Sequence, residues 1–248
     1  MIVIFILLGI FLYMLKQASE NNVLHHEVRF NGESERARLF FISDVHLRKI
    51  DKKMIRKLEG TFDAVIIGGD FCDKRTPLQR IYNNIELLQQ VGPIYFVWGN
   101  NDREVGEGNL REIFKRYNVK IIENDAELIP SLTNRCWICA IDDTSSKNVH
   151  YEKTFKKCRE EDQVIFISHN PEIFATVRRK YRTNLMMGGH LHGGQIRFGP
   201  YGIHPHGSFS MREGVATLIS NGYGTTALPL RFGAKPQCHV IDLHFHKE

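Results

Sequence analysis

The apolar positions of this chain fall into short runs that are separated by polar segments. Runs of three to five apolar residues, bounded by polar residues or glycine, predict strands that are buried on both faces of a sheet. Apolar residues at helical spacing follow several of these runs, and this alternation is typical of an α/β protein. The buried strands are predicted at residues 39–43, 64–67, 94–98, 164–167 and 185–187.

Three helices are predicted in the first half of the chain. Residues 47–58 form a basic helix candidate. Pro77 is typical of a first helical position, and apolar residues recur at helical spacing over 78–88. Asn109 and Glu112 have the spacing of a capping box, which predicts that a further helix begins there.

The second half of the chain is richer in strand. No internal repeat and no linker rich in Pro, Gly or Ser divides the sequence, so we predict one domain over residues 38–248. This domain is α/β in its first half and β-rich in its second. Its further strand candidates are residues 119–122, 127–129, 136–141, 195–198, 215–220 and 239–244.

The amino terminus predicts a membrane anchor over residues 1–16, followed by a polar tether over residues 17–37. The first 15 residues carry no charge, and as a helix they would be about 22 Å long, against about 30 Å of hydrocarbon. The segment is therefore short for a span unless Lys16 snorkels and the bilayer thins. A buried helix is the alternative.

The flanks of this segment bear on its processing and orientation. No basic residue precedes the apolar run, which argues against a cleaved signal peptide. Lys16 and Arg29 follow it, and the positive-inside rule then predicts a protein of the cell membrane with its catalytic domain in the cytoplasm.

Composition excludes several classes of protein. The chain has 248 residues, of which 42% are hydrophobic and 25% charged, so it is neither disordered nor collagen-like. A net charge of +5 is too small to favour nucleic acid as a partner by itself. The five cysteines are an odd number without a compact framework, which predicts reduced thiols in a reducing compartment.

Polar residues with metal-binding side chains follow the five buried strands. Because ligands bind beyond the carboxyl ends of strands in open α/β sheets, we expect these side chains to converge. Residues i and i+2 of an extended chain point the same way, so the pairs in D-x-H and H-x-H can each face one site. The mixture of oxygen and imidazole suits borderline divalent ions. The candidate ligands are Asp44, His46, Asp70, Asn100, His169, His190 and His192.

The motifs D-x-H, G-G-D, G-N-x-D, S-H-N-P and G-H-x-H-G-G-Q, in this order, resemble those of the calcineurin-like metallophosphoesterase superfamily. The hydrophobic start and the segment 220–231 resemble its bacterial membrane-anchored branch, which includes hydrolases of nucleotide-diphosphate-linked lipids. The resemblance implies a two-sheet β-sandwich flanked by helices, in four αββα layers. It also implies cleavage of a phosphodiester or pyrophosphate by a metal-bound hydroxide.

The resemblance also implies a role for each candidate residue. Asp44, His46 and His192 would bind one metal ion, Asp70 would bridge two ions, and Asn100, His169 and His190 would bind the other. Mn²⁺ is the expected ion, with Fe, Zn or Ni as alternatives. His204 and Arg231 are candidate substrate contacts.

The chain departs from the family pattern at Asn101, where the usual residue is a His that acts on the leaving oxygen and is oriented by the next acid, here Asp102. An amide donates a hydrogen bond but cannot supply a proton, and general acid catalysis is typically worth about 10²–10⁴ in rate. We therefore expect Asn101 and Asp102 to form a catalytic pair that favours good leaving groups or turns over slowly. The alternatives are a nuclease or cyclic-nucleotide phosphodiesterase, and a metal-binding scaffold with little turnover.

Overall fold

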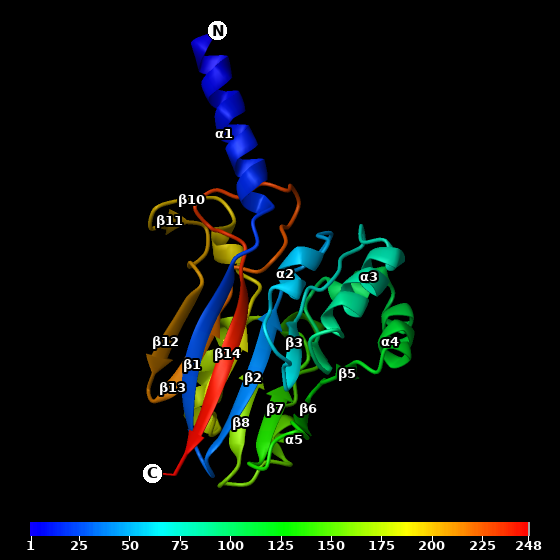
Figure 1. The fold of residues 1–248 in the computed structure, drawn as a ribbon, viewed down its shortest axis with the longest axis vertical. Helices are drawn as coiled ribbons and strands as arrows, with labels where there is room; N and C mark the ends of the chain where they lie inside the picture. Colours follow the sequence, from blue (N-terminus) through cyan, green and yellow to red (C-terminus); the bar gives the residue numbers. More distant parts are fainter. Residues whose placement is uncertain (248) are drawn as a thin grey trace.

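The computed structural model describes residues 1–247, and it contains two six-stranded sheets that lie face to face (Figure 1). The first sheet has the order β1-β14-β2-β3-β4-β5, and the second has the order β12-β13-β9-β8-β7-β6. The first comprises β1 (Val23–Asn31), β14 (Cys238–His246), β2 (Glu35–Ile42), β3 (Ala64–Gly68), β4 (Ile94–Val97) and β5 (Lys120–Ile121). The second comprises β12 (Ser208–Arg212), β13 (Val215–Ile219), β9 (Leu185–Gly188), β8 (Gln163–Ile167), β7 (Cys136–Ala140) and β6 (Asp125–Leu128).

The central strands of both sheets are parallel, which brings their carboxyl ends to one edge of each sheet. In the first sheet β2, β3, β4 and β5 run parallel, and in the second β7, β8, β9 and β13 do so. Strands such as β3 and β8 are buried at every position, as their continuous apolar sequences predict.

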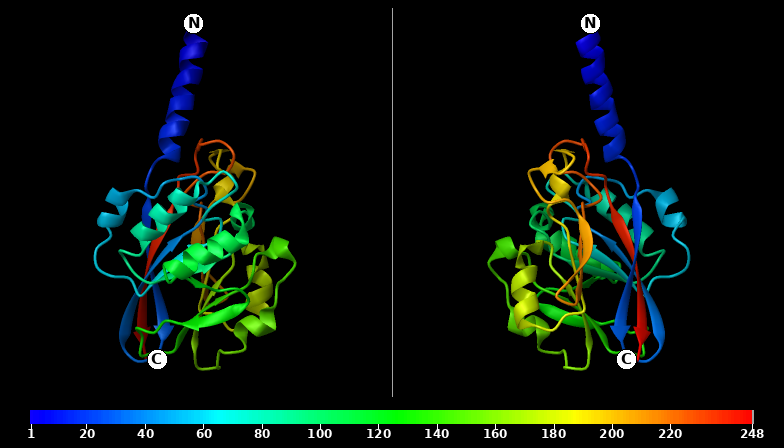
Figure 2. Two further views of the ribbon diagram at one scale, coloured as in Figure 1. Left: turned by 90° about the vertical axis from the view of Figure 1, so that its right-hand side faces the viewer. Right: turned by 90° about the vertical axis from the view of Figure 1, so that its left-hand side faces the viewer.

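Helices cover the outer faces of the two sheets and complete four layers (Figure 2). Leu39, Phe41 and Ile165 belong to the core between the sheets, whereas Phe40 and Phe166 face the two helical layers. The predicted αββα sandwich is thereby confirmed. The first helical layer comprises α2 (Lys52–Arg56), α3 (Leu78–Leu88) and α4 (Glu107–Arg116), and the second α5 (Tyr151–Phe155) and α6 (Phe174–Lys180). Short 3₁₀ turns are η1 (Asp102–Val105), η2 (Thr144–Ser146), η3 (Pro171–Ile173) and η4 (His192–Gly194).

Two predicted helix boundaries are wrong. The basic helix expected over 47–58 shrinks to α2, because the side chain of Asp51 caps the amides of Lys53 and Met54. The proposed capping box also fails, since α4 begins at Glu107 and Asn109 lies within its first turns.

The predicted tether is also wrong, because residues 17–37 are largely built into the fold. β1 pairs in parallel with β14 over nine residues, and β2 begins at Glu35. The strand is amphipathic, with Val28 and Phe30 buried and their neighbours more exposed. This alternation identifies an edge strand that the polar composition of the segment concealed.

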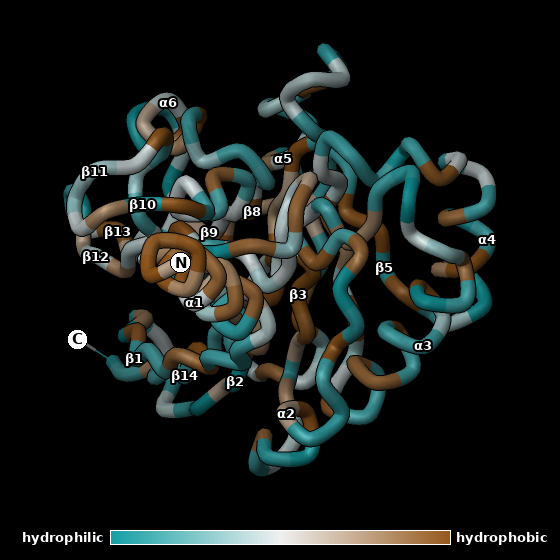
Figure 3. Tube along the Cα trace, turned by 90° about the horizontal axis from the view of Figure 1, so that it is seen from above, coloured by the Kyte–Doolittle hydropathy of each residue, from teal (hydrophilic) through white to brown (hydrophobic). Residues whose placement is uncertain are grey.

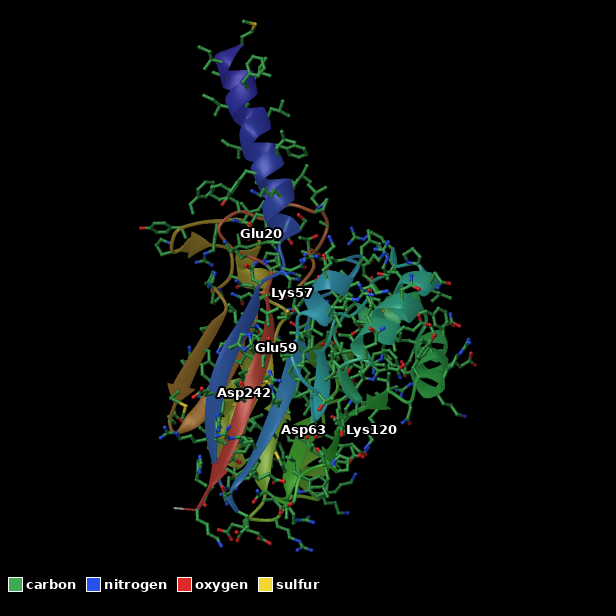
Figure 4. All side chains as sticks on the ribbon, in the orientation of Figure 1. Glu20, Lys57, Glu59, Asp63, Lys120 and Asp242 are labelled. Carbon is green, nitrogen blue, oxygen red and sulfur yellow. The ribbon has the colours of Figure 1, made fainter. Side chains whose placement is uncertain are left out.

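The helix α1 (Ile2–Ala18) projects from the end of the body, with its side chains standing free on every side (Figure 4). Figure 3 shows it end on as a mainly apolar coil. Its foot is fixed, because Gln17 and Ala18 are buried and the Arg231 amide donates to the Met14 carbonyl at 3.2 Å. Within residues 1–247, no helix combines the length and apolarity needed to cross a membrane.

Candidate metal centre

Six of the predicted ligands gather into two groups at the carboxyl ends of the parallel strands. Within each group, one possible ligand atom from each residue lies within 4.8 Å of the others. The residues follow strands of both sheets, so the site straddles the edge where the two sheets meet. The first group is Asp44, His46 and His192, and the second is Asp70, His169 and His190.

The first group is closely packed around the carboxylate of Asp44. His192 Nε2 lies 3.4 Å from Asp44 Oδ1 and 3.2 Å from His46 Nε2. All three residues are buried. Both carboxylate oxygens of Asp44 also accept from the amide of His190, at 3.0 and 3.2 Å, so the carboxylate is held in place by the loop that carries His192.

The second group is centred on Asp70, which also approaches the first group. Asp70 Oδ2 lies 3.3 Å from His169 Nε2 and 3.7 Å from His46 Nε2. His169 Nε2 in turn lies 3.3 Å from His190 Nδ1 and 3.9 Å from Asp44 Oδ1. The carboxylate of Asp70 therefore stands between the two groups.

The backbone at these ligands is unusual, because Asp44, His46, Asp70, His190 and His192 all have positive φ, between 49° and 70°. Non-glycine residues rarely adopt this conformation, and such outliers cluster at functional sites. The extended geometry expected for the D-x-H and H-x-H pairs is therefore wrong. Asp44 and His46 still meet in one group, but His190 and His192 serve different groups.

Glycines bring the backbone close enough to hold the ligands. A Cβ on Gly99 would collide with the backbone and carboxylate of Asp70, and one on Gly189 would collide with the carboxylate of Asp44. Gly222, with φ +72°, lies against Asp44 from the opposite segment. The carboxylates are thus enclosed by backbone that only glycine permits at such short range.

The Nδ1 atoms of two imidazoles face groups outside the two ligand groups, and one of the two rings is fixed by a hydrogen bond. His169 Nδ1 lies 2.9 Å from the Gly68 carbonyl oxygen and donates to it, which leaves Nε2 facing Asp70. The hydrogen bond to Gly68 sets the tautomer of His169. His46 Nδ1 lies 3.4 Å from Asp73 Oδ2 but forms no hydrogen bond, and Arg75 donates to the same Asp73 oxygen at 2.7 Å. Asp73 was missed in the sequence, although it stands only three residues after Asp70.

The charges in the centre shift its pKa values strongly. Burial opposes ionisation of Asp70, but His169 and His46 outweigh it and hold the pKa of this carboxyl below its ordinary value. Burial disfavours a charged His169, yet Asp70 raises its pKa to about 10. Burial, together with Arg231 and His46, lowers the pKa of His192 to about 3.

The two amides of the G-N-N-D segment differ in position. Asn100, the expected ligand, is exposed. Asn101 donates to Asp70 twice, from its backbone amide to Oδ1 at 2.8 Å and from Nδ2 to Oδ2 at 2.6 Å. The side chain of Asn101 is therefore the amide that reaches the carboxylate between the two groups.

Asp102 does not have the contacts expected of a catalytic partner for residue 101. It is fully buried, and its carboxylate accepts from the backbone amides of Gly99, Asp70 and Cys72 at 2.7, 2.8 and 3.1 Å. Burial, together with the charge of Asp70, raises the pKa of Asp102 to about 7. Asp102 thus positions the backbone that presents Asp70.

Arg231 is not placed as a substrate contact either, because it is fully buried. Its guanidinium donates to the carbonyl oxygens of Gly224, Asn221 and Ala234, and to that of His192 at 3.2 Å. Arg231 therefore joins the backbone of His192 to the backbone of the segment 221–234. His204 is exposed, and its backbone amide lies beside Gly194 in the turn that follows His192.

The residues present fit a pair of divalent cations. Buried imidazole nitrogens face one another and two carboxylates at 3.2–3.4 Å, an arrangement that a cation stabilises. No thiol joins either group in the described chain, and mixed imidazole and carboxylate ligands suit Mn²⁺, Fe²⁺ or Zn²⁺.

Relatives of this chain are found among bacterial and animal proteins. The uncharacterized protein YpbG of Bacillus subtilis is 41% identical over 207 residues, which are 83% of this chain and 80% of the relative. The phosphodiesterase YaeI of Escherichia coli is 23% identical over 240 residues, covering 89% of this chain and 87% of that protein. A transmembrane protein with metallophosphoesterase domain from Bos taurus is 25% identical over 230 residues, which cover 81% of this chain and 51% of the bovine protein.

Among solved structures, the 5'-nucleotidase precursor of Thermus thermophilus matches with a TM-score of 0.51 and 11% identity, over 77% of this chain and 49% of that chain. This chain thus spans about half the length of that nucleotidase, and the likeness shows the fold alone. The family model for calcineurin-like phosphoesterases matches residues 37–194, which include all seven predicted metal ligands. On this match and on the 41% identity to its Bacillus relative, the chain belongs to the calcineurin-like phosphoesterase family.

Proposed function

We propose that this chain hydrolyses a phosphodiester or a pyrophosphate with two divalent metal ions. The observation that carries the proposal is the position of Asp70, whose Oδ2 lies 3.3 Å from His169 in one ligand group and 3.7 Å from His46 in the other. A carboxylate between two groups of three ligands suits a pair of ions that share it. When bound, such ions ionise water near neutral pH and offset charge on phosphoryl oxygens.

Other residues of the chain position and orient the candidate metal ligands. The Gly68 carbonyl orients His169, and the Nε2 atoms of His169 and His46 both face Asp70. Asp102 holds the backbone of Asp70, and the His190 amide holds Asp44. We include Asn100 in the second ligand group, as the family resemblance implies, and Mn²⁺ as the ion.

Asn101 favours substrates with good leaving groups. Its amide lies on Asp70 and has no proton to transfer at neutral pH. A nucleotide phosphate leaves without protonation, which favours a pyrophosphate or an activated diester. The similarity to the Escherichia coli phosphodiesterase supports a diester in the same way.

We extend the proposal to the membrane. The apolar side chains of α1 are exposed, with Ile2 77% and Phe5 67% accessible. The helix leaves the body at the same end as the metal centre, because Arg231 links the Met14 carbonyl to that of His192. We infer that α1 inserts into the cytoplasmic face of the cell membrane and that the substrate is a lipid-linked nucleotide.

The test is an assay of the full-length protein in detergent, loaded in turn with Mn²⁺, Fe²⁺, Zn²⁺ and Ni²⁺. We expect it to cleave bis-p-nitrophenyl phosphate faster than p-nitrophenyl phosphate, and Asp70→Asn to abolish the cleavage. His204→Ala, close to the turn after His192, tests the remaining substrate candidate through its KM. Metal binding without hydrolysis of either ester would reject the enzyme and favour a scaffold, for which Asn101 is the motivating feature.

A further inference from the structure

We propose that the body of the protein has a second membrane-contacting surface, which inserts into the lipid interface beside α1. This surface, the apolar collar, consists of Ile196, Phe198, Tyr201, Ile203 and Leu228. It is built on the hairpin of β10 (Arg197–Phe198) and β11 (Tyr201–Gly202) and on the loop 225–230. The inference rests on the proposed insertion of α1, but not on the catalytic proposal.

The exposure of the collar is unusual for the body of this protein. Among the described residues that follow α1, the three most exposed large apolar side chains are Ile203 at 82%, Tyr201 at 79% and Phe198 at 68%. Leu228, also in the collar, is 63% exposed, and Met211 on β12, outside it, is 66% exposed. Grouped exposed apolar side chains mark sites of protein or membrane contact, whereas scattered ones carry no such meaning.

The collar is continuous with α1 through one aromatic residue. The ring of Phe232 lies 5.8 Å from that of Tyr13 in α1 and 4.9 Å from that of Phe198 in the hairpin. The adjacent Arg231 amide donates to the Met14 carbonyl. Figure 1 shows β10 and β11 beside the foot of the helix. The apolar surface of α1 therefore runs without interruption onto the hairpin.

The hairpin is held rigidly to the metal centre. Arg197 is buried beneath it and donates to the carbonyls of Gly199 and Pro200 at the turn, at 2.9 and 2.8 Å. The same guanidinium donates to the Gly193 carbonyl at 2.9 Å, directly after His192. Insertion of the collar would thus hold the loop of His190 and His192 at a fixed height against the lipid headgroups.

The length of α1 identifies a bilayer as the partner of the collar. A helix of 17 residues is about 25 Å long, shorter than the hydrocarbon layer of about 30 Å. When this helix is fully inserted, its foot stays at the level of the interface, and the collar around the foot is pressed into the same layer. Aromatic side chains such as Phe198 and Tyr201 are favoured there. A second copy of the chain would leave the helix itself uncovered.

The experiment places a fluorescent probe at three positions of the full-length protein in vesicles of phosphatidylcholine and phosphatidylglycerol that contain brominated phosphatidylcholine. Both native tryptophans, Trp98 and Trp137, are buried and give a constant background. The variants are Phe198→Trp in the collar, Phe5→Trp in α1, and Met211→Trp. Met211 is the matched control, because it is 66% exposed but lies on β12, whose hairpin points away from α1 (Figure 1).

We expect brominated lipid to quench the added emission of Phe198→Trp and Phe5→Trp and to leave that of Met211→Trp unchanged. Quenching of Phe5→Trp alone would overturn the collar while the α1 anchor stands, and quenching of neither would reject both. A collar probe that is shielded from aqueous acrylamide but not quenched by lipid would assign the surface to a second copy of the chain instead. Tyr201→Trp repeats the test if Phe198→Trp fails to fold.

Hydrolysis of bis-p-nitrophenyl phosphate by the same samples separates this inference from the proposed function. The collar does not include a metal ligand, so Phe198→Trp should leave the rate on this soluble ester unchanged. The triple variant Phe198→Ser, Tyr201→Ser, Ile203→Ser should weaken binding to vesicles by at least about tenfold, since it removes three apolar side chains from the lipid interface. Unchanged vesicle binding of that variant would contradict the collar.

Discussion

The side-chain amide of Asn101 donates to the carboxylate of Asp70 at 2.6 Å. The residue that contacts the carboxylate between the two ligand groups is therefore neutral and cannot transfer a proton. The backbone amide of the same residue donates to the other oxygen of Asp70 at 2.8 Å. Asn101 thereby fixes Asp70 and contributes no acid to the reaction.

Replacement of Asn101 by histidine should therefore change the dependence on the leaving group. We expect Asn101→His to raise kcat for a phenyl phosphodiester by about tenfold or more, a part of the factor of about 10²–10⁴ that a fully positioned general acid supplies. The rate for the corresponding p-nitrophenyl diester should change little, because nitrophenolate leaves without a proton. Asn101→Gln is the control, and an equal gain or no gain with both esters would contradict the prediction.

Two ligand groups predict two metal ions per chain. His46→Gln should remove one ion and His190→Gln the other, whereas Asp70→Asn should weaken both sites, because its carboxylate adjoins both groups. Elemental analysis after gel filtration measures the stoichiometry. His206→Gln, an exposed histidine outside both groups, is the matched control. One ion in the wild-type protein, or two in every variant, would reject the assignment.

The same analysis tests the contribution of Asn100. As the amide ligand that the resemblance implies, Asn100→Ala should lower the occupancy of the second site. Full occupancy of both sites in Asn100→Ala would remove this residue from the ligand set. Because Asn100 is exposed, this variant is the sharpest test of the predicted ligand set.

Asp102 should contribute to the free energy of unfolding. Its carboxylate accepts three backbone amides, and an asparagine would turn a donor toward one of them. We expect Asp102→Asn to lower the free energy of unfolding by about 1–3 kcal/mol, the cost of an unsatisfied buried group. The ratio of rates on phenyl and p-nitrophenyl esters should stay constant. Glu104→Gln, an exposed acid in the same turn, controls for the loss of charge in denaturant unfolding. A changed ratio in Asp102→Asn would restore a catalytic role.

The ligands could be predicted because each follows a continuous apolar run, and a run of this kind fixes both a buried strand and the edge at which it ends. His46, His169 and His192 gather at the sheet edge, as this pattern predicts, and their role as metal ligands stays a prediction. Their assignment to two ions came from the family resemblance and stays a prediction.

Other features depend on contacts that no local pattern carries. The charge of Arg231 suggested a phosphate contact, but its guanidinium is fully buried and donates to backbone carbonyl oxygens such as that of Gly224. Asp102 lies in the expected motif, but only the fold shows that backbone amides take both of its oxygens. Asp44 and His46 adopt a left-handed backbone conformation within the loop that follows β2. The prediction that the D-x-H pair is extended was therefore wrong.

A buried histidine away from the metal centre predicts loss of stability in acid. His239 on β14 is 1% exposed, with Nε2 2.9 Å from Ser220 Oγ and Nδ1 3.1 Å from His26 Nε2. Burial, with a smaller contribution from His26, lowers its pKa from 6.5 to about 3. Since the unfolded chain binds this proton below pH 6.5 and the folded protein does not, the free energy of unfolding should fall as the pH drops from 6.5 toward 3. This group contributes at most about 1.4 kcal/mol per pH unit.

Denaturant unfolding at pH 8, 6.5 and 5 measures this dependence in the wild type and in His239→Gln. Glutamine can keep a hydrogen bond to Ser220 but does not titrate, so the variant should lose less stability between pH 6.5 and 5 than the wild type. His246→Gln, an exposed histidine on the same strand, should retain the full pH dependence. Because the metal ligands are identical in all three proteins, equal slopes in the wild type and His239→Gln would show that the buried imidazole is not the source of the acid sensitivity.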